Sequence, residues 1–431
     1  MADISNSGAI SARHRLGALL RERRGLILDY LTAVSGSAGR LVFSLIYFVS
    51  LANALSLADF GLFATASAAG VMLSRLLAFG FISALYRTAT VRPNLIGTFT
   101  AGFILLGLIS LPLLAAASVL VYAAFFAASM TPLVFGAIVA AEALLYRPVE
   151  TVMIVNNGLG RFGKAAMIAI LAIVLRAVAA ALFFFSVDRG LGTWVYYYFA
   201  ANLACLVIGF AFFYPRQRLR FVPRLYWRRL ADSIYTAGAE VLFYLQMELD
   251  KLLVLLIGGP TLAGIYAILM RLVDLTAIPI RTFSMMLVQR IMRAPEMLSR
   301  FKLKVSIEAG IFVASTLAML ILALVLRVYP TLLGRNVAEA APLLLLALLV
   351  PGLRNLVEYQ AELLYARGQT LIRSINLALL AAMKALVLVV ILGNTDAPAD
   401  MVVALNWGFG LLYLCSILLT YSALRRPAKR V

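Results

Sequence analysis

Long apolar stretches separated by short polar segments form the dominant pattern of this chain. We place about twelve such stretches at 29–55, 61–87, 95–120, 132–155, 165–186, 193–214, 232–257, 263–289, 303–326, 340–365, 374–392 and 401–422. A helix needs about 20 predominantly apolar residues to cross the hydrocarbon core of a bilayer. The pattern therefore predicts an all-α polytopic membrane protein with about twelve transmembrane helices.

The composition supports this prediction. Hydrophobic residues make up 63% of the 431 positions and charged residues 13%, and the mean hydropathy is +0.98. A soluble domain is roughly half apolar and about a quarter charged. A chain this apolar cannot cover a water-facing surface, so the composition excludes a soluble protein.

The basic residues are distributed unevenly between the two sides of the predicted membrane. The net charge is +19, and most Lys and Arg outside the spans lie in the N-terminal segment, the C-terminal tail and the loops on the same side, whereas the other side holds Arg189, Arg327 and Arg335. Cytoplasmic loops carry an excess of Lys and Arg. We therefore expect a multi-pass membrane protein with both termini in the cytoplasm. Because the charge follows topology, we expect no nucleic-acid partner.

Few residues suit metal binding or catalysis. Cys205 and Cys415 lie inside apolar spans, and His14 is the one histidine of the sequence. These residues indicate no disulfide framework, no His-based metal cluster and no Ser–His arrangement. The longest loop on the less basic side, 327–339, holds Glu339 as its one acid, so a membrane glycosyltransferase or polysaccharide polymerase is a weaker interpretation. We expect neither an enzyme nor a cofactor.

The sequence divides into two similar halves. Gly61 aligns with Gly264 at an offset of 203 residues, and Glu150 aligns with Glu358 at an offset of 208. Six spans per half give both halves the same orientation, a repeat found in transporters that bind substrate where the halves meet. We predict an N-terminal segment (1–28), an N-lobe (29–214), a basic linker (215–231), a C-lobe (232–422) and a tail (423–431). The linker is either an amphipathic segment on the membrane surface or a plain basic loop.

Specific motifs around spans seven and eight resemble a known family. They are 249–253 (LDKLL), 258–260 (GGP), 263–267 (AGIYA) and 270–272 (MRL), and the first half has counterparts in 39–41 (GRL), 57–63 (LADFGLF), 78–80 (AFG) and 85–87 (LYR). They are similar to motifs of the bacterial polysaccharide (O-antigen or exopolysaccharide) transporters of the multidrug/oligosaccharidyl-lipid/polysaccharide exporter superfamily. The resemblance implies a V-shaped pair of six-helix lobes, and a flippase that moves a lipid-pyrophosphate-linked oligosaccharide to the outer leaflet. It also implies a location in the bacterial inner membrane and contact with other polysaccharide assembly proteins.

Charged residues lie inside the predicted spans. The cations are Arg40, Arg75, Arg147, Arg176, Lys251, Arg271, Arg281, Arg354 and Lys384, and the acids are Glu142, Glu150, Glu240, Glu248, Asp250, Asp274, Glu308, Glu358 and Glu362. A charge at the bilayer centre costs roughly 2.5–3.5 kcal/mol, so each group needs water, a counter-charge or the membrane surface. Helical spacing pairs Arg147 with Glu150, Arg271 with Asp274, and Arg354 with Glu358. These pairs are either structural ties or substrate contacts.

Two sets of these charges are candidates for transport. Cations that could bind the anionic head group of a substrate are Arg40, Lys251, Arg271, Arg281, Arg147 and Arg354. Carboxylates that could couple transport to H⁺ or Na⁺ are Glu142, Glu240, Asp250 and Glu358. Glu142, Tyr146 and Glu150 share one helix face, as do Arg354, Glu358 and Glu362, and each stripe is predicted to line the cleft of its lobe.

The leading hypothesis is an alternating-access flippase of lipid-linked oligosaccharides. The alternative is a multidrug or cation antiporter of the same superfamily, which would favour an acidic cleft, whereas span one carries Arg40. A non-enzymatic scaffold would leave the buried charges unexplained.

Overall fold

A computed structural model describes residues 41–293, 301–395 and 397–425 of the chain, and these residues form helices joined by short loops. The described part contains nine helices that are long and apolar enough to cross a membrane. One of them, α9 (Pro223–Arg293), is 71 residues long and is broken at Gly259, so it makes two crossings. The predicted all-α polytopic fold is confirmed.

The helices follow the predicted spans. The first half consists of a helix described over Leu41–Ala54, α2 (Leu57–Ser74), η1 (Leu77–Gly80), α3 (Ile82–Val91), η2 (Pro93–Leu95), α4 (Ile96–Phe125), α5 (Pro132–Ala140), η3 (Ala141–Tyr146), α6 (Arg147–Gly158), α7 (Phe162–Phe184), α8 (Leu191–Ile208) and η4 (Gly209–Phe213). The second half consists of α9, α10 (Phe301–Val328), α11 (Arg335–Ala340), α12 (Leu343–Leu346), α13 (Val350–Ala366), α14 (Thr370–Gly393) and α15 (Pro398–Leu424).

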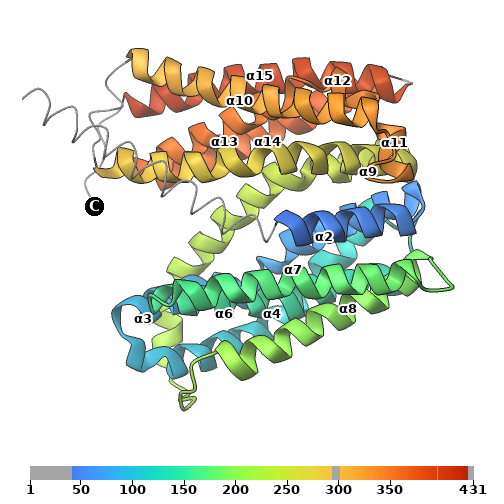
Figure 1. Cartoon of the computed structure of the whole chain (residues 1–431). Helices are drawn as coiled ribbons and strands as arrows, with labels where there is room; N and C mark the ends of the chain where they lie inside the picture. The colour runs from blue at the N-terminus through green and yellow to red at the C-terminus, as the bar shows by residue number, and fades with distance from the viewer. Residues whose placement is uncertain (1–40, 294–300, 396, 426–431) are drawn as a thin grey trace, which may run out of the picture.

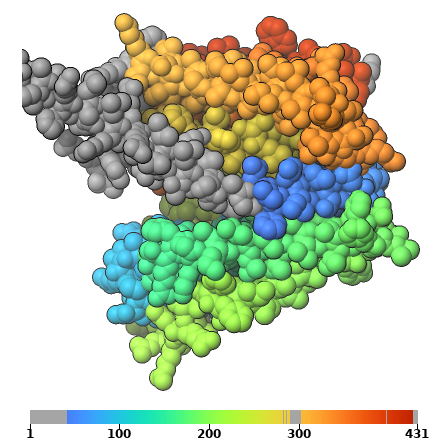
Figure 2. Space-filling model, viewed as in Figure 1, coloured from blue at the N-terminus to red at the C-terminus, as the bar shows by residue number. Residues whose placement is uncertain are grey.

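The helices form two lobes arranged as a V (Figure 1). The first part of α9 packs on η1, α3 and α4 and then crosses to the second lobe, where α9 packs on α13 and α14. We call the end with loops 159–161, 215–222 and 367–369 the basic side, and the end with loops 126–131, 185–190 and 329–334 the opposite side. The lobes are in contact where α2 packs along α9, and Figure 2 shows the blue start of the described chain between the green N-lobe and the orange C-lobe.

Close backbone contacts join the lobes on the opposite side. A Cβ atom on Gly61 would lie 2.4 Å from the backbone nitrogen of Gly264, and one on Gly264 would lie 2.1 Å from the carbonyl oxygen of Leu57. The two glycines that the sequence repeat aligns therefore face each other across the lobe interface. Small residues allow such close helix packing in membranes.

Two asparagines add hydrogen bonds at the same end. The Asn53 amide donates to the carbonyl of Leu333 at 3.1 Å and accepts from the backbone N–H of Arg335 at 2.7 Å. The Asn336 amide donates to the carbonyls of Ala52 at 2.6 Å and Leu55 at 2.9 Å. The Asn336 bonds satisfy carbonyls at the end of the helix Leu41–Ala54, where no further turn donates N–H groups to them.

Span two differs from the prediction of one continuous helix over 61–87. Ser56 caps α2 by accepting the backbone N–H of Asp59 at 3.1 Å. The helix then breaks after Ser74, because Ala78, Phe79 and Gly80 have φ values of 54°, 49° and 71°. Residues with a Cβ adopt this left-handed region at a cost of about 1–3 kcal/mol each. Tertiary contacts hold it, including a bond from the Ala78 N–H to the Ser110 hydroxyl at 2.9 Å.

The predicted basic linker is partly helical, because α9 begins at Pro223. Gln217 accepts the backbone N–H of Gly97 and donates to the carbonyl of Pro93, both at 2.9 Å. The Tyr226 hydroxyl donates to the carbonyl of Thr98 at 2.9 Å. The linker is therefore fixed to the start of α4.

The close contact at Gly264 predicts that two glycine-to-alanine substitutions differ in their effect on stability. Gly264→Ala forces α2 and α9 apart, so we expect it to lower the stability by about 1–3 kcal/mol, the usual cost of overpacking. Gly136→Ala is the matched control, because a Cβ there meets nothing within 4 Å. The denaturation midpoint of the purified protein measures the effect, and equal midpoints for the two variants would contradict the contact.

Candidate functional site

A cluster of four charged side chains lies at the junction of the N-lobe with α9. We call Arg75, Arg147, Glu150 and Glu240 the seam cluster. Arg75 makes two bonds to Glu150, at 2.9 and 3.2 Å, and Arg147 contacts Glu150 at 2.8 Å and Glu240 at 2.7 Å. The ring of Tyr244 lies 4.2 Å from the Arg75 guanidinium carbon. The cluster joins α2, α6 and α9 and is neutral in sum.

The C-lobe contains a cavity of about 690 Å³ between the two crossings of α9 and α13. Its charged lining residues are Glu248, Asp274, Arg281, Arg354, Glu358 and Glu362. Phe243, Tyr359 and Tyr365 add aromatic rings to the wall. Aromatic walls with a few convergent polar groups are typical of sites that bind organic ligands.

Ion pairs connect the charges of this cavity. Arg281 binds Glu358 through two bonds of 2.9 Å and Asp274 through one of 3.0 Å. Arg354 contacts Asp274 at 3.3 Å and Glu358 at 3.7 Å. Lys251 pairs with Glu248 one turn away, and Arg373 contacts Glu362 at 2.7 Å. An incoming charged group can therefore bind here by replacing one partner of an existing pair.

Two further groups of charges are buried inside the lobes. Lys384 contacts Asp250 at 3.0 Å and the carbonyl of Gln246 at 2.8 Å, and Tyr266 donates to Asp250 at 2.7 Å. In the N-lobe, Arg176 lies 3.5 Å from Glu142, which also accepts the hydroxyls of Ser67 and Tyr198. Asp250 and Glu142 are only 1% and 2% exposed. Such pairs mainly compensate the cost of burying a charge.

The predicted helical pairs are confirmed in two cases and wrong in one. Arg147 pairs with Glu150, and Arg354 with Glu358. Asp274 instead pairs with Arg281 and Arg354, because these side chains converge from α13 and from the next turns of α9. Arg271 donates to the hydroxyl of Ser44 on the first helix. Arg40 lies outside the described residues.

The two predicted stripes have different outcomes. Arg354, Glu358 and Glu362 do line the C-lobe cavity. In the first half, Glu142 faces the interior of the N-lobe, Tyr146 lies under Arg176 at 4.2 Å, and Glu150 faces Arg75. The π-helical segment Ala141–Tyr146 changes the angular spacing that a period of 3.6 residues assumes. The predicted lining of an N-lobe cleft by this stripe is therefore wrong.

Two residues of interest had no role in the sequence-based prediction. Arg75 enters the seam cluster because α2 ends there, which the sequence pattern did not show. Glu308 on α10 accepts bonds from Gln360 at 3.2 Å, Tyr413 at 2.9 Å and Tyr421 at 2.6 Å. Within the described residues, Glu308 has no ion pair. The sequence did not signal this, since Lys304 lies four residues before Glu308, at the spacing of a helical ion pair that the structure does not contain.

No protein-family model and no curated protein sequence matches this chain. Several solved structures do match it. An inward-facing multidrug-resistance MATE family transporter of the MOP superfamily gives a TM-score of 0.66 at 14% identity, covering 90% of this chain and 94% of that one. A MOP superfamily transporter from Pyrococcus furiosus gives 0.60 at 12% identity (92% and 95%), and a mutant of the Vibrio cholerae MATE transporter VcmN gives 0.56 at 15% identity (93% and 96%). This chain therefore has the V-shaped fold of MATE transporters.

The buried pair in the C-lobe predicts a stability effect. Lys384→Met leaves the Asp250 carboxylate without its cation, so we expect a loss of about 3–5 kcal/mol. Adding Asp250→Asn removes the unpaired charge and should recover most of the loss, because the amide oxygen of the new side chain can still accept the Tyr266 hydroxyl. Denaturation midpoints of the wild type, the single variant and the double variant measure this. A stable Lys384→Met protein would show that Asp250 is not held by this pair.

Proposed function

We propose that this protein is a transporter that works by alternating access between its two lobes. The observation that carries the proposal is a cavity lined by exchangeable ion pairs inside a V that is joined on the opposite side. Transporters with repeated halves bind their substrates between helices of this kind and rock one half against the other. If the basic side is cytoplasmic, the V opens inward, as in the inward-facing structure that it resembles.

The first candidate substrate is an organic cation or drug. Four acids, Glu248, Asp274, Glu358 and Glu362, line the cavity beside two arginines, and aromatic rings complete its wall. A cation can pair with such a carboxylate and stack on an aromatic face. Solved structures with this fold are described as multidrug-resistance transporters, which supports this candidate more directly than a flippase.

The second candidate is a lipid-pyrophosphate-linked oligosaccharide. Arg271 favours it, because this arginine has no ion pair within the described residues and lies where α9 meets the first helix. A guanidinium with a neutral partner can bind a phosphate without displacing a carboxylate. Arg281 and Arg354 would hold the same head group further along α9 and α13. In this case the bilayer and polysaccharide assembly proteins are the partners.

Coupling to H⁺ or Na⁺ requires a carboxylate that can change its charge state. The predicted candidates Glu142, Glu240, Asp250 and Glu358 each lie within 4 Å of an arginine or lysine, so each already has a counter-charge. Glu308 is surrounded by two tyrosine hydroxyls and an amide, with Lys304 placed over the Tyr421 ring at 5.2 Å. The Oε1 atom of Gln360 is buried and has no hydrogen-bond partner. Because its direct partners are neutral, we assign the coupling of transport to H⁺ or Na⁺ to Glu308.

Transport by full-length protein in proteoliposomes distinguishes the two candidates. Ethidium and an undecaprenyl-type pyrophosphate oligosaccharide are the two probes. For an organic cation, Glu358→Gln should lower ethidium transport about tenfold, because it removes a charged hydrogen-bond partner. If the substrate is the lipid-linked oligosaccharide, Arg271→Gln should lower transport of the oligosaccharide about tenfold. Arg189→Gln, in a loop on the opposite side, is the control, and absence of transport of both probes would overturn the transporter proposal.

Coupling at Glu308 has its own test. Glu308→Gln should abolish the dependence of transport on the imposed ion gradient while leaving substrate binding in place, because a neutral amide cannot exchange a cation. Tyr421→Phe removes one donor and should shift the ion dependence to a smaller extent. The exposed Glu339→Gln variant is the control. Unaltered gradient dependence in Glu308→Gln would exclude this role.

A further inference from the structure

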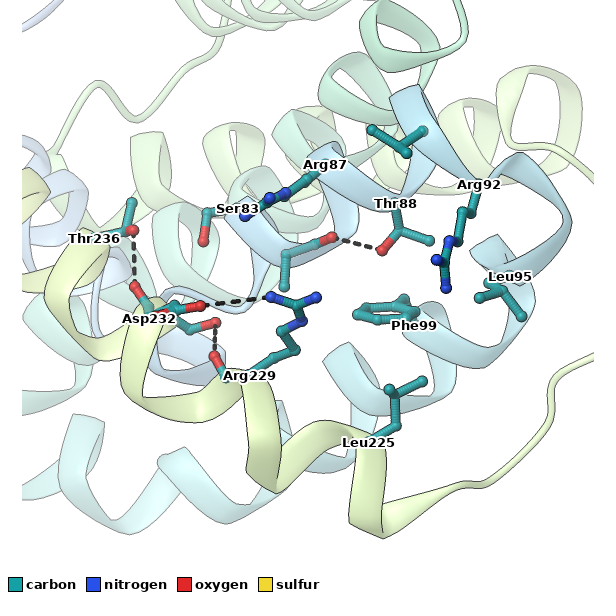
Figure 3. Close-up of a pocket in the computed structure, with 13 residues that line it drawn as sticks. Ser83, Arg87, Thr88, Arg92, Leu95, Phe99, Leu225, Arg229, Asp232 and Thr236 are labelled. Atoms are coloured by element: carbon teal, nitrogen blue, oxygen red, sulfur yellow. Dashed lines mark hydrogen bonds and ion pairs between the residues drawn. The ribbon is translucent and has the colours of Figure 1, made fainter. Parts of the chain in front are cut away.

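A second cavity lies at the basic side, outside the transport cavity. Its volume is about 510 Å³, and α3, the start of α4 and the start of α9 enclose it. Arg87, Arg92 and Arg229 extend from these elements around it (Figure 3). Its one acid is Asp232, which lies 3.6 Å from Arg229.

The cavity has an excess of positive charge with free donors. Within the described residues, neither Arg87 nor Arg92 has an ion pair. The hydroxyls of Ser83, Thr88, Ser233 and Thr236 donate to carbonyls three or four residues earlier in the chain, so Arg87 and Arg92 are the available donors. Guanidinium groups bind phosphate oxygens through paired N–H bonds. The chemistry of the cavity therefore suits a phosphate group.

The other lining residues suit a ligand with an apolar part. Val91, Leu95, Phe99 and Leu225 form this part of the wall. A cavity of this size exceeds what a bare phosphate fills, so the ligand carries a further group on the phosphate.

The surroundings place the cavity at the level of lipid head groups. Leu219, Phe221 and Trp227 of the adjoining linker and helix start are 60%, 62% and 63% exposed. Neighbouring Arg218, Arg220, Arg224 and Arg228 are exposed as well. Apolar and aromatic side chains interleaved with arginines are typical of segments that lie in the membrane interface. A lipid phosphate can therefore reach the cavity directly from the bilayer.

We propose that this cavity binds the phosphodiester head group of an anionic membrane lipid, with Arg87, Arg92 and Arg229 as its ligands. The bound lipid bridges α3 and α4 to the start of α9. It therefore stabilises the attachment of the crossing helix to the N-lobe. The proposal does not depend on which substrate the protein transports.

Binding of a short-chain phosphatidylglycerol to the full-length protein in detergent tests the site. The triple variant Arg87→Gln/Arg92→Gln/Arg229→Gln should bind this lipid roughly tenfold or more weakly, since each lost charged hydrogen bond costs that order. The control variant Arg161→Gln/Arg224→Gln/Arg228→Gln removes the same charge from exposed positions that do not line the cavity. It should keep the binding, and equal losses in both triple variants would overturn the proposal.

Two further ligands separate a lipid from a soluble phosphate ester. Diacylglycerol with the same chains lacks the phosphate and should not bind measurably. Glycerol 1-phosphate lacks the chains and should compete only weakly with the lipid. If glycerol 1-phosphate binds as tightly as the lipid, or if diacylglycerol binds equally well, the assignment to a lipid phosphate is wrong. Native mass spectrometry of the wild-type protein and the two triple variants provides the measurement and shows that the variants are folded.

Discussion

The cost of placing a charge in hydrocarbon is the constraint on which the rest of this structure depends. The chain meets it by joining charges on different helices: Arg75 and Arg147 hold Glu150 and Glu240, Arg281 and Arg354 hold Asp274 and Glu358, and Lys384 holds Asp250. Each group is close to neutral, so the protein can keep many ionised residues at membrane depth. The same requirement fixes which helices lie together, because a helix that carries one partner must face the helix that carries the other.

The contacts between the lobes are of two physical kinds. On the opposite side, backbone approaches at Gly61 and Gly264 and the amides of Asn53 and Asn336 join the lobes by close packing and hydrogen bonds. Toward the basic side, the seam cluster joins α9 to the N-lobe through ion pairs, whose partners can be exchanged. A packed interface has discrete arrangements, whereas ion pairs can be replaced by water or by a ligand. On span two both kinds of contact precede the left-handed residues 78–80, because Gly61 lies near the start of α2 and Arg75 is its C-terminal cap.

Most buried charges of the described residues have an ion-pair partner, and several of our proposals rest on the few that do not. Arg271 has a hydroxyl as its partner, and Glu308 has hydroxyls and an amide, so neither has an ion pair within the described residues. Arg87 and Arg92 of the basic-side cavity are a third case. In our proposals, Arg271 would bind the lipid-linked candidate substrate, Glu308 the coupling ion and the basic-side cavity a lipid phosphate, whereas an organic cation would bind in the C-lobe cavity.

The sequence by itself determined the fold class, the approximate spans and the presence of charges in the membrane, because hydropathy and the length of the hydrocarbon core act locally along the chain. The two-lobe arrangement was indicated by the internal repeat and by the family resemblance. It also indicated the pairs Arg147–Glu150 and Arg354–Glu358, whose spacing lies within one helix. The tertiary structure alone decided the break after Ser74, the π-helical turn before Arg147, the partners of Asp274, and the convergence of Tyr413, Tyr421 and Gln360 on Glu308. These features depend on side chains from helices far apart in the chain, and a period of 3.6 residues carries no information about which helices become neighbours.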